Sequence, residues 1–259
     1  MKHNYFVSII TALVYIFLIG PLFIIAGASF GTEEYLQFPP KGFTLHWFQN
    51  ILEVGNFLPA CAVSIEIAIL ATVIALLIGV PSAYAFSRFS FPGKKVMNII
   101  FQSPILVPGI VMGFILMRYI IVQFNLPVLL SLLVGHTLLV IPYVMRNVCA
   151  SLSNFDPSVE EAAMSLGANR AVVICRIVLP NIKSGILAAC ILSIVNSFNN
   201  VPLSVFLSGP GVTTLPISML NYVEYHFDPT VAALSTVLML VTVVIMLIVD
   251  KTLGLKSIA

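Results

Sequence analysis

Three ionisable side chains lie within the long apolar runs of this sequence: Glu66, Arg118 and His136. A charged group is costly in a bilayer, so such residues are candidates for a solute pathway, a proton relay or an ion pair between helices. For Glu66 we weigh direct solute contact against an ion pair with Arg118 or with a partner subunit. Arg118 also lies close enough to the end of its run for its guanidinium to reach the headgroups. We expect His136 to be a neutral, hydrogen-bonded packing residue rather than a relay.

A cluster of amides lies in a later apolar run, which reads Asn196-Ser197-Phe198-Asn199-Asn200-Val201-Pro202. Its three asparagines are hard to place against lipid, so we predict that they line a polar pathway. Pro202 lacks a backbone donor and would free the carbonyl of Phe198 toward a water-filled cavity. The alternative is a helix that frays as it leaves the membrane.

Residue groupings that support catalysis are missing from the sequence. His136 has no second ligand at metal-binding spacing, and the four cysteines are scattered. The phosphate-binding pattern Gly-x-x-x-x-Gly-Lys-Ser/Thr does not occur, so we expect no nucleotide site in this chain. A membrane-embedded enzyme is therefore disfavoured, because it would need a nucleophile–base pair or metal ligands within its spans.

The composition of the chain is that of a membrane protein. Of its 259 residues, 59% are hydrophobic and only 8% are charged, and the mean hydropathy is +1.08. Soluble domains are about 25% charged, so a soluble fold of this composition could not solvate its surface. A net charge of +2 without a basic stripe gives no indication of a nucleic-acid partner. We therefore predict an all-α protein that crosses the membrane several times, with lipid around it.

Six apolar stretches reach the roughly 20 residues that a membrane-spanning helix needs. We place the spans of one transmembrane domain, residues 1–259, near 6–28, 58–86, 99–122, 127–146, 184–204 and 230–249. The first stretch is too long for the core of a signal peptide, so we expect an uncleaved span. Prolines should bend or break several helices, most of all the central segment Pro104-Ile105-Leu106-Val107-Pro108-Gly109.

The basic residues predict the orientation, because cytoplasmic loops of membrane proteins carry an excess of lysine and arginine. With the N-terminus inside, ten of the twelve basic residues fall on the cytoplasmic side: Lys2, Arg88, Lys94, Lys95, Arg146, Arg170, Arg176, Lys183, Lys251 and Lys256. Six spans then place both termini in the cytoplasm. On the outer side we expect a turn at Ser208-Gly209-Pro210-Gly211, a surface helix over 216–227, and Asp228 as the N-cap of the last span.

The longest cytoplasmic segment, 147–183, contains the signals of two short helices. Asp156 suits an N-cap, Pro157 suits the first helical position, and Gly167 suits the left-handed residue that ends a helix. We predict a helix over 157–166, roughly 15 Å long. A second helix should run from about Asn169 until Pro180 prevents its continuation.

The first of these helices has a composition suited to docking. Ala162 and Ala163 would let another surface approach the backbone closely. Glu160 and Glu161 lie near the positive end of the helix dipole and would be available to basic residues of a partner. The alternative is a capped helical hairpin that only connects two spans.

The same residues resemble the EAA loop of permease subunits of ABC importers. The matching positions are Glu161-Ala162-Ala163, Gly167 after three residues, and Ile177-Val178-Leu179-Pro180 after nine more. The resemblance extends from about Pro59 to Thr252 and includes Tyr84-Ala85-Phe86-Ser87-Arg88, Phe91-Pro92-Gly93-Lys94 and Leu207-Ser208-Gly209-Pro210-Gly211. These details look most like the spermidine/putrescine-type group of permeases.

The resemblance implies the type I importer permease fold in the bacterial cytoplasmic (inner) membrane. It implies a second permease subunit, as a heterodimer or homodimer, two cytoplasmic ATPase subunits that bind ATP and Mg, and an extracytoplasmic solute-binding protein. This chain itself would hold no cofactor or metal and would hydrolyse nothing. The residues that would couple it to the ATPase are Glu160, Glu161, Ala162, Ala163, Gly167, Leu179 and Pro180.

One departure from the polyamine-type pattern leaves the solute open. Relatives of that type often carry acidic residues where this chain has Asn199 and Asn200, and Arg118 would repel a cation. Amino-phosphonates, amino acids and small organic acids therefore remain alternatives to polyamines. An ion-coupled secondary carrier that uses Glu66 is the second functional hypothesis, although it gives no reason for the loop from Asp156 to Pro180.

Overall fold

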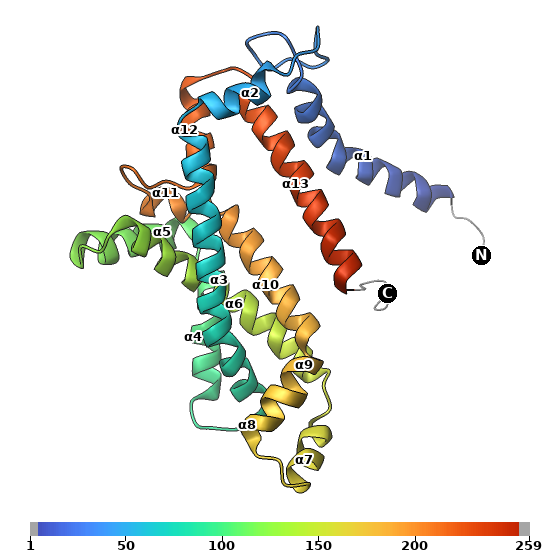
Figure 1. Ribbon diagram of the computed structural model, residues 1–259, viewed down its shortest axis with the longest axis vertical. Coiled ribbons are helices and arrows are strands. Elements are labelled where there is room, and N and C mark those ends of the chain that lie inside the picture. Colours follow the sequence, from blue (N-terminus) through green and yellow to red (C-terminus); the bar gives the residue numbers. More distant parts are fainter. Residues whose placement is uncertain (1–4, 254–259) are drawn as a thin grey trace. The chain divides into compact units, whose positions relative to one another are not determined.

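The computed structural model describes residues 5–253, and its regular elements there are helices (Figure 1). Two compact units make up the chain: Met1–Leu58 with Met219–Ala259, and Pro59–Ser218. Lys2 and Lys256, which count toward the predicted orientation, lie outside the described residues.

Four helices within the described residues are long and apolar enough to cross a membrane. They are α1 (Tyr5–Ala28), α3 (Phe57–Arg88), α6 (Val128–Ser153) and α13 (Thr230–Leu253). Two bent helix pairs raise the number of spans to as many as six if each pair is one span. These elements correspond to the six apolar stretches of the sequence.

The third stretch is not the single helix that we predicted over 99–122. It is divided into α4 (Lys94–Leu106), α5 (Gly109–Leu116) and the π-helix η1 (Met117–Gln123), with a bend of 103° at the break. Val107 has the extended angles φ −85° and ψ 129° because the ring of Pro108 disfavours a helical conformation in the residue before it. The break falls inside the segment whose prolines predict irregular structure.

The fifth stretch also differs from its predicted bounds of 184–204. The helix α10 (Lys183–Phe198) ends earlier, and a short helix α11 (Ser204–Leu207) follows. Pro202 therefore lies beyond α10, so the expectation that it opens a carbonyl within a helix is wrong. A turn with a bridge between Gly209 and Val212 comes next, as predicted.

The segment before α10 runs through Pro180 instead of ending there. It consists of α8 (Arg170–Val173), the π-helix η2 (Ile174–Val178) and α9 (Leu179–Asn181), and it meets α10 at 69°. The proline removes one backbone donor. Nearby, the side-chain amide of Asn181 donates to the carbonyl of Ile177 at 2.7 Å, which satisfies one acceptor of this turn.

The core of the second unit lies where α3 and α10 pack against α6. Alanines of α3 and valines of α6 are fully buried there, and glycines bring the backbones close. A Cβ on Gly79 would meet Val144, and one on Gly185 would overlap the side chain of Ser151. The buried residues of this core are Ala71, Ala75, Ala83, Phe86, Val140, Ile141, Val144, Met145, Val148, Leu152, Val173, Val178, Ile182 and Ala189.

The first unit contains a helix that we did not predict, α2 (His46–Glu53). The indole of the buried Trp47 donates to the carbonyl of Gly31 at 2.8 Å, and the amide of Asn50 donates to the hydroxyl of Thr230 at 2.8 Å. The predicted surface helix over 216–227 is α12 (Leu215–Tyr225). The carboxylate of Asp228 accepts the amide hydrogen of Thr230 at 2.9 Å, as expected of an N-cap.

Candidate functional site

We call the predicted coupling segment, about residues 154–180, the docking loop. Its first helix is α7 (Pro157–Ser165), which lies with α8 at one end of the second unit (Figure 1). Asp156 is its N-cap and accepts the amide hydrogen of Ser158 at 2.9 Å. This hydrogen bond stabilises the carboxylate and lowers the pKa of Asp156 below its usual value. The start of the helix is therefore set by the residues that predict it.

The end of α7 is a Schellman motif, with Gly167 at a φ of +90°. The amide of Gly167 donates to the carbonyl of Met164 at 3.0 Å, and the amide of Ala168 donates to the carbonyl of Ala163 at 3.1 Å. Asn169 then caps the next helix by accepting the amide hydrogen of Val172 at 2.9 Å. The two capped helices are thus joined at a glycine, as predicted.

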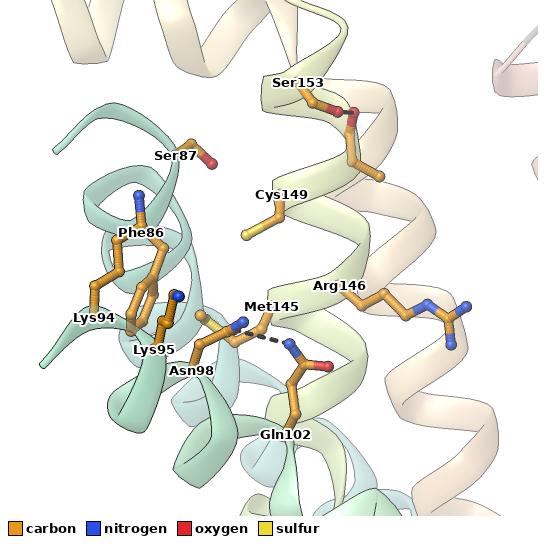
Figure 2. A pocket seen from close by; sticks show the side chains of 11 residues that line it. Phe86, Ser87, Lys94, Lys95, Asn98, Gln102, Met145, Arg146, Cys149 and Ser153 are labelled. Atoms are coloured by element: carbon orange, nitrogen blue, oxygen red, sulfur yellow. Dashed lines mark hydrogen bonds between the residues drawn. The ribbon is translucent and has the colours of Figure 1, made fainter. Parts of the chain in front are cut away.

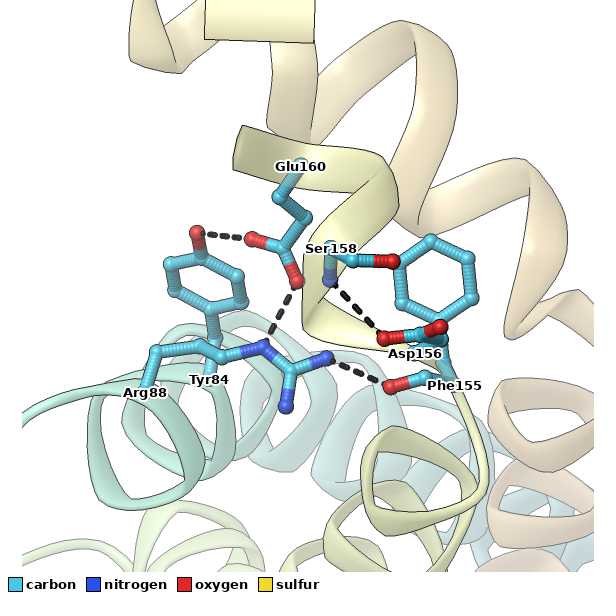
Figure 3. Close-up of polar contacts among 6 residues, drawn as sticks. All are labelled: Tyr84, Arg88, Phe155, Asp156, Ser158 and Glu160. Carbon is cyan, nitrogen blue, oxygen red and sulfur yellow. Dashed lines mark hydrogen bonds and ion pairs between the residues drawn. The ribbon is translucent and has the colours of Figure 1, made fainter. Parts of the chain in front are cut away.

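Glu160 lies in a different environment from the one we expected. Its side chain was predicted to be available to a partner, but the residue is only 5% exposed. The hydroxyl of Tyr84 donates to one carboxylate oxygen at 2.7 Å, and Nε of Arg88 donates to the other at 2.6 Å (Figure 3). The carboxylate is therefore occupied within this chain, since burial without such partners would be very unfavourable.

The sequence predicts no coupling role for the two residues that bind Glu160, Tyr84 and Arg88. They lie one turn apart on α3, so both side chains reach the same carboxylate. Arg88 also donates to the carbonyl of Phe155 at 3.1 Å, just before α7 begins. Their i, i+4 spacing is visible in the sequence, but it does not indicate that their partner is residue 160.

The remaining predicted coupling residues fall into two groups. Ala163 and Leu179 are half-buried and pack against the core of the second unit. Glu161, Ala162, Gly167 and Pro180 are exposed. The exposed group adjoins Leu166, whose side chain is 90% exposed at the tip of the loop. Leu166 and the exposed coupling residues together form the accessible tip of the loop.

Glu66 on α3 and Arg118 on η1 are both exposed in this chain. The ion pair found among the described residues joins Arg88 to Glu160 instead. An ion pair between Glu66 and Arg118 within the chain is therefore a wrong expectation. Roles for the two residues in solute contact or in a contact with a partner subunit stay predictions.

The three asparagines near the end of α10 satisfy hydrogen bonds locally. The amides of Asn196 and Asn199 donate to the carbonyls of Leu192 and Val195, four residues earlier, at 2.8 and 3.1 Å. The side-chain oxygen of Asn200 accepts the amide hydrogen of Leu203 at 3.0 Å. Asn199 is exposed and Asn196 and Asn200 are half-buried, so their pathway role stays a prediction.

His136 is a buried packing residue, as expected, with 1% of its surface exposed. Its Nδ1 lies 2.8 Å from the hydroxyl of Ser197, and its Nε2 lies 3.0 Å from the hydroxyl of Ser204. One serine belongs to α10 and the other to α11. The imidazole therefore connects the two helices across the segment 199–203.

A cavity of about 610 Å³ opens between α3, α4 and α6 (Figure 2). None of the five predicted pathway residues lines it. Lys94 and Lys95 lie on the α4 side, and Arg146 on α6 points away from them. The full lining consists of Phe86, Ser87, Lys94, Lys95, Asn98, Gln102, Met145, Arg146, Cys149, Ala150 and Ser153.

The described part of the chain holds no group of three or more histidine, cysteine, aspartate or glutamate side chains that could bind a metal ion. The candidate functional features of the described residues are a capped, partly exposed loop and polar residues within apolar helices.

Comparisons with known proteins agree with these features. The spermidine/putrescine transport system permease protein PotC of Escherichia coli is 29% identical over 247 residues, which cover 93% of each chain. PhnV of Salmonella paratyphi A, named for a proposed 2-aminoethylphosphonate transport system, is 29% identical over 93% of this chain and 92% of its own.

A solved structure shares the fold. A chain of a bacterial ABC transporter involved in the import of the acidic polysaccharide alginate aligns with a TM-score of 0.73 and 18% identity, over 97% of this chain and 98% of that chain. Residues 71–254 match the family model described as "Binding-protein-dependent transport system inner membrane component". The chain therefore belongs to this family, as a permease subunit of a binding-protein-dependent ABC importer.

Proposed function

We propose that the chain forms half of a translocation pathway, paired with a second permease subunit, for a small polar solute of the polyamine type or a related chemistry. The observation that carries this proposal is the loop of α7 and Gly167, in which both helix ends are fixed by hydrogen bonds while Leu166 and Glu161 stay exposed. An exposed tip between two capped helix ends fits a loop that docks on another protein, and the resemblance of its residues to the EAA loop supports this role.

The partner of this surface is an ATPase subunit. Two such subunits bind ATP and Mg, hydrolyse the nucleotide, and drive the loop of each permease. The lack of a phosphate-binding motif in this chain supports placing hydrolysis in the partner. An extracytoplasmic binding protein delivers the solute from the other side of the membrane.

The orientation follows from the distribution of charge. Six spans with both termini in the cytoplasm of a bacterial cell put α7 and α8 at the inner face of the inner membrane. Arg88, Arg170 and Arg176 support this arrangement, because all three lie at or near the loop. ATP is available on that face, which is the side where the ATPase must bind.

The solute class is inferred from the names of two relatives and from the polar residues of this chain. One relative is named for spermidine and putrescine and the other for 2-aminoethylphosphonate, and all three solutes carry an amino group. Asn199 and Asn200 are neutral, and the exposed Arg118 would favour a solute that carries an anionic group as well. An amino-phosphonate fits this combination at least as well as a polyamine.

Reconstitution tests the proposal. The chain is purified from its native membrane with the subunits that accompany it, placed in proteoliposomes with the binding protein, and supplied with spermidine, putrescine or 2-aminoethylphosphonate. We expect uptake of one of these solutes that requires ATP and the binding protein. Uptake by the chain alone, driven by an ion gradient and abolished by Glu66→Gln, would instead support a secondary carrier.

A further inference from the structure

The C-terminal end of α3 and Phe89, the residue that follows it, contact both helices of the docking loop. Tyr84 and Arg88 bind Glu160, in the first turn of α7 (Figure 3). The guanidinium of Arg170, at the start of α8, lies over the ring of Phe89 at 4.8 Å from its centroid. The two short helices are thus held to the same end of one long helix.

The contact with α7 is charged and largely shielded from water. The side chains of Arg88 and Glu160 are 13% and 6% exposed, and each makes a further hydrogen bond besides the ion pair. Losing one member of such a pair leaves the other charge buried without compensation, so the pair resists separation. The contact is therefore stiff compared with a pair of charges on an open surface.

Tyr84 and Arg88 belong to α3, which is also one of the candidate membrane spans. Glu66 and Arg88 are 22 residues apart on α3, roughly 33 Å at 1.5 Å per residue. Ala71, Ala75 and Ala83 of the same helix are fully buried in the core of the second unit. A displacement delivered at Arg88 therefore acts on the helix that carries the predicted pathway residue Glu66.

We propose that Tyr84 and Arg88 are positioning residues that join α7 to α3 through Glu160, so that the two helices move together when the ATPase displaces the loop. This inference rests on the proposed function. Glu160 then acts inside the permease, while the adjacent Glu161 faces the partner. Two neighbouring glutamates would have two distinct tasks, set by their burial.

The test is a set of substitutions in the complete reconstituted importer. Arg88→Gln and Glu160→Gln should each lower the number of solute molecules moved per ATP by about tenfold or more, as expected for breaking a buried charged pair. The double variant should lose no more transport per ATP than either single variant, because each single substitution already breaks the contact between Arg88 and Glu160. Arg88→Lys, which keeps the charge, should recover part of the ratio.

Three further measurements separate coupling from folding. The ATPase should still co-purify with each variant, and ATP hydrolysis without binding protein should continue. Tyr84→Phe removes one hydrogen bond without unpairing a charge, so it should fold and still lower the ratio, by a smaller factor of about twofold to fivefold. The matched control is Lys183→Gln, which removes an exposed positive charge on α10 and should behave as wild type.

The outcomes distinguish the proposed contact between α3 and α7 from the proposed importer function. Wild-type transport per ATP in Arg88→Gln and Tyr84→Phe would overturn the proposed joint while leaving the importer function intact. Losses that multiply in the double variant would also overturn it, because they would show two independent effects. Absence of ATP-dependent transport in the wild type and in Lys183→Gln would instead contradict the proposed function itself. If Arg88→Gln fails to fold, Tyr84→Phe decides.

Discussion

Gly167 is the residue at which the direction of the docking loop is set. Its φ of +90° is a conformation that side chains other than glycine adopt at a cost of about 1–2 kcal/mol. No other group lies within 4 Å of the position that a Cβ would occupy. The requirement for glycine therefore comes from the backbone and not from a lack of space.

The effect of a substitution at Gly167 on coupling should depend on how well the new residue adopts a positive φ, and not on the size of its side chain. We expect Gly167→Val and Gly167→Leu to uncouple ATP hydrolysis from transport, since the connection between α7 and α8 would shift. Gly167→Asn should retain more coupling, because asparagine tolerates the left-handed conformation. Transport per ATP in proteoliposomes gives the order, and wild-type coupling in Gly167→Val would contradict this account.

His136 should contribute to stability and not to proton transfer. His136→Ala removes both hydrogen bonds to Ser197 and Ser204 and leaves a cavity, which should lower the free energy of unfolding by about 2–4 kcal/mol. Thermal unfolding in detergent measures the loss. The control His46→Ala, at an exposed histidine, should change the midpoint little. Equal midpoints for the two variants would rule out the structural role.

At the scale of elements, the bent helices are the features that hydropathy could not describe. The apolar stretches indicate six spans; four of them correspond to long single helices, and the third and fifth correspond to bent helix pairs. The bend at Val107 could be anticipated from two prolines, because a proline acts on its local neighbours. The early end of α10 at Phe198 also follows a local signal, since Pro202 has no amide hydrogen for the carbonyl of Phe198 and disfavours a helical conformation in Val201.

The packing of α6 against α10 depends on the absence of a side chain at Gly185. A Cβ at this position would overlap Ser151, so Gly185→Ala should lower stability by about 1–3 kcal/mol. Combining it with Ser151→Gly should recover part of the loss. Gly20→Ala on α1, where a Cβ meets nothing within 4 Å, is the control and should not lower stability, because alanine favours a helix more than glycine does. Thermal unfolding tests this; a neutral Gly185→Ala would contradict the close packing.

The end of α10 offers a direct test of the predicted pathway. In a Cys175→Ser background, which removes the exposed native cysteine, Asn199→Cys should react with a water-soluble thiol reagent. The reaction should slow when ATP changes the transport state. Ser197→Cys, at a buried position on the same turn, should stay unreactive. Inertness of Asn199→Cys in every state would argue for packing against a partner instead.

At the scale of the whole molecule, the two helices of the docking loop were predictable from the sequence, but the contact of α7 with α3 was not. Asp156, Pro157 and Gly167 are local signals, and each acts within a few residues of its position. The ion pair between Arg88 and Glu160 joins residues 72 positions apart. Only the folded arrangement of α3 and α7 brings them together, so sequence analysis placed Glu160 at a partner's surface instead.

The central claim is that the exposed tip of this loop binds an ATPase, and co-purification tests it most directly. The complex is extracted from its native membrane with wild-type chain, with Leu166→Asp, and with Leu36→Asp, which changes another exposed leucine far from the loop in sequence. We predict that an ATPase accompanies the wild type and Leu36→Asp and is lost from Leu166→Asp. Equal recovery of the ATPase with all three chains would contradict the claim.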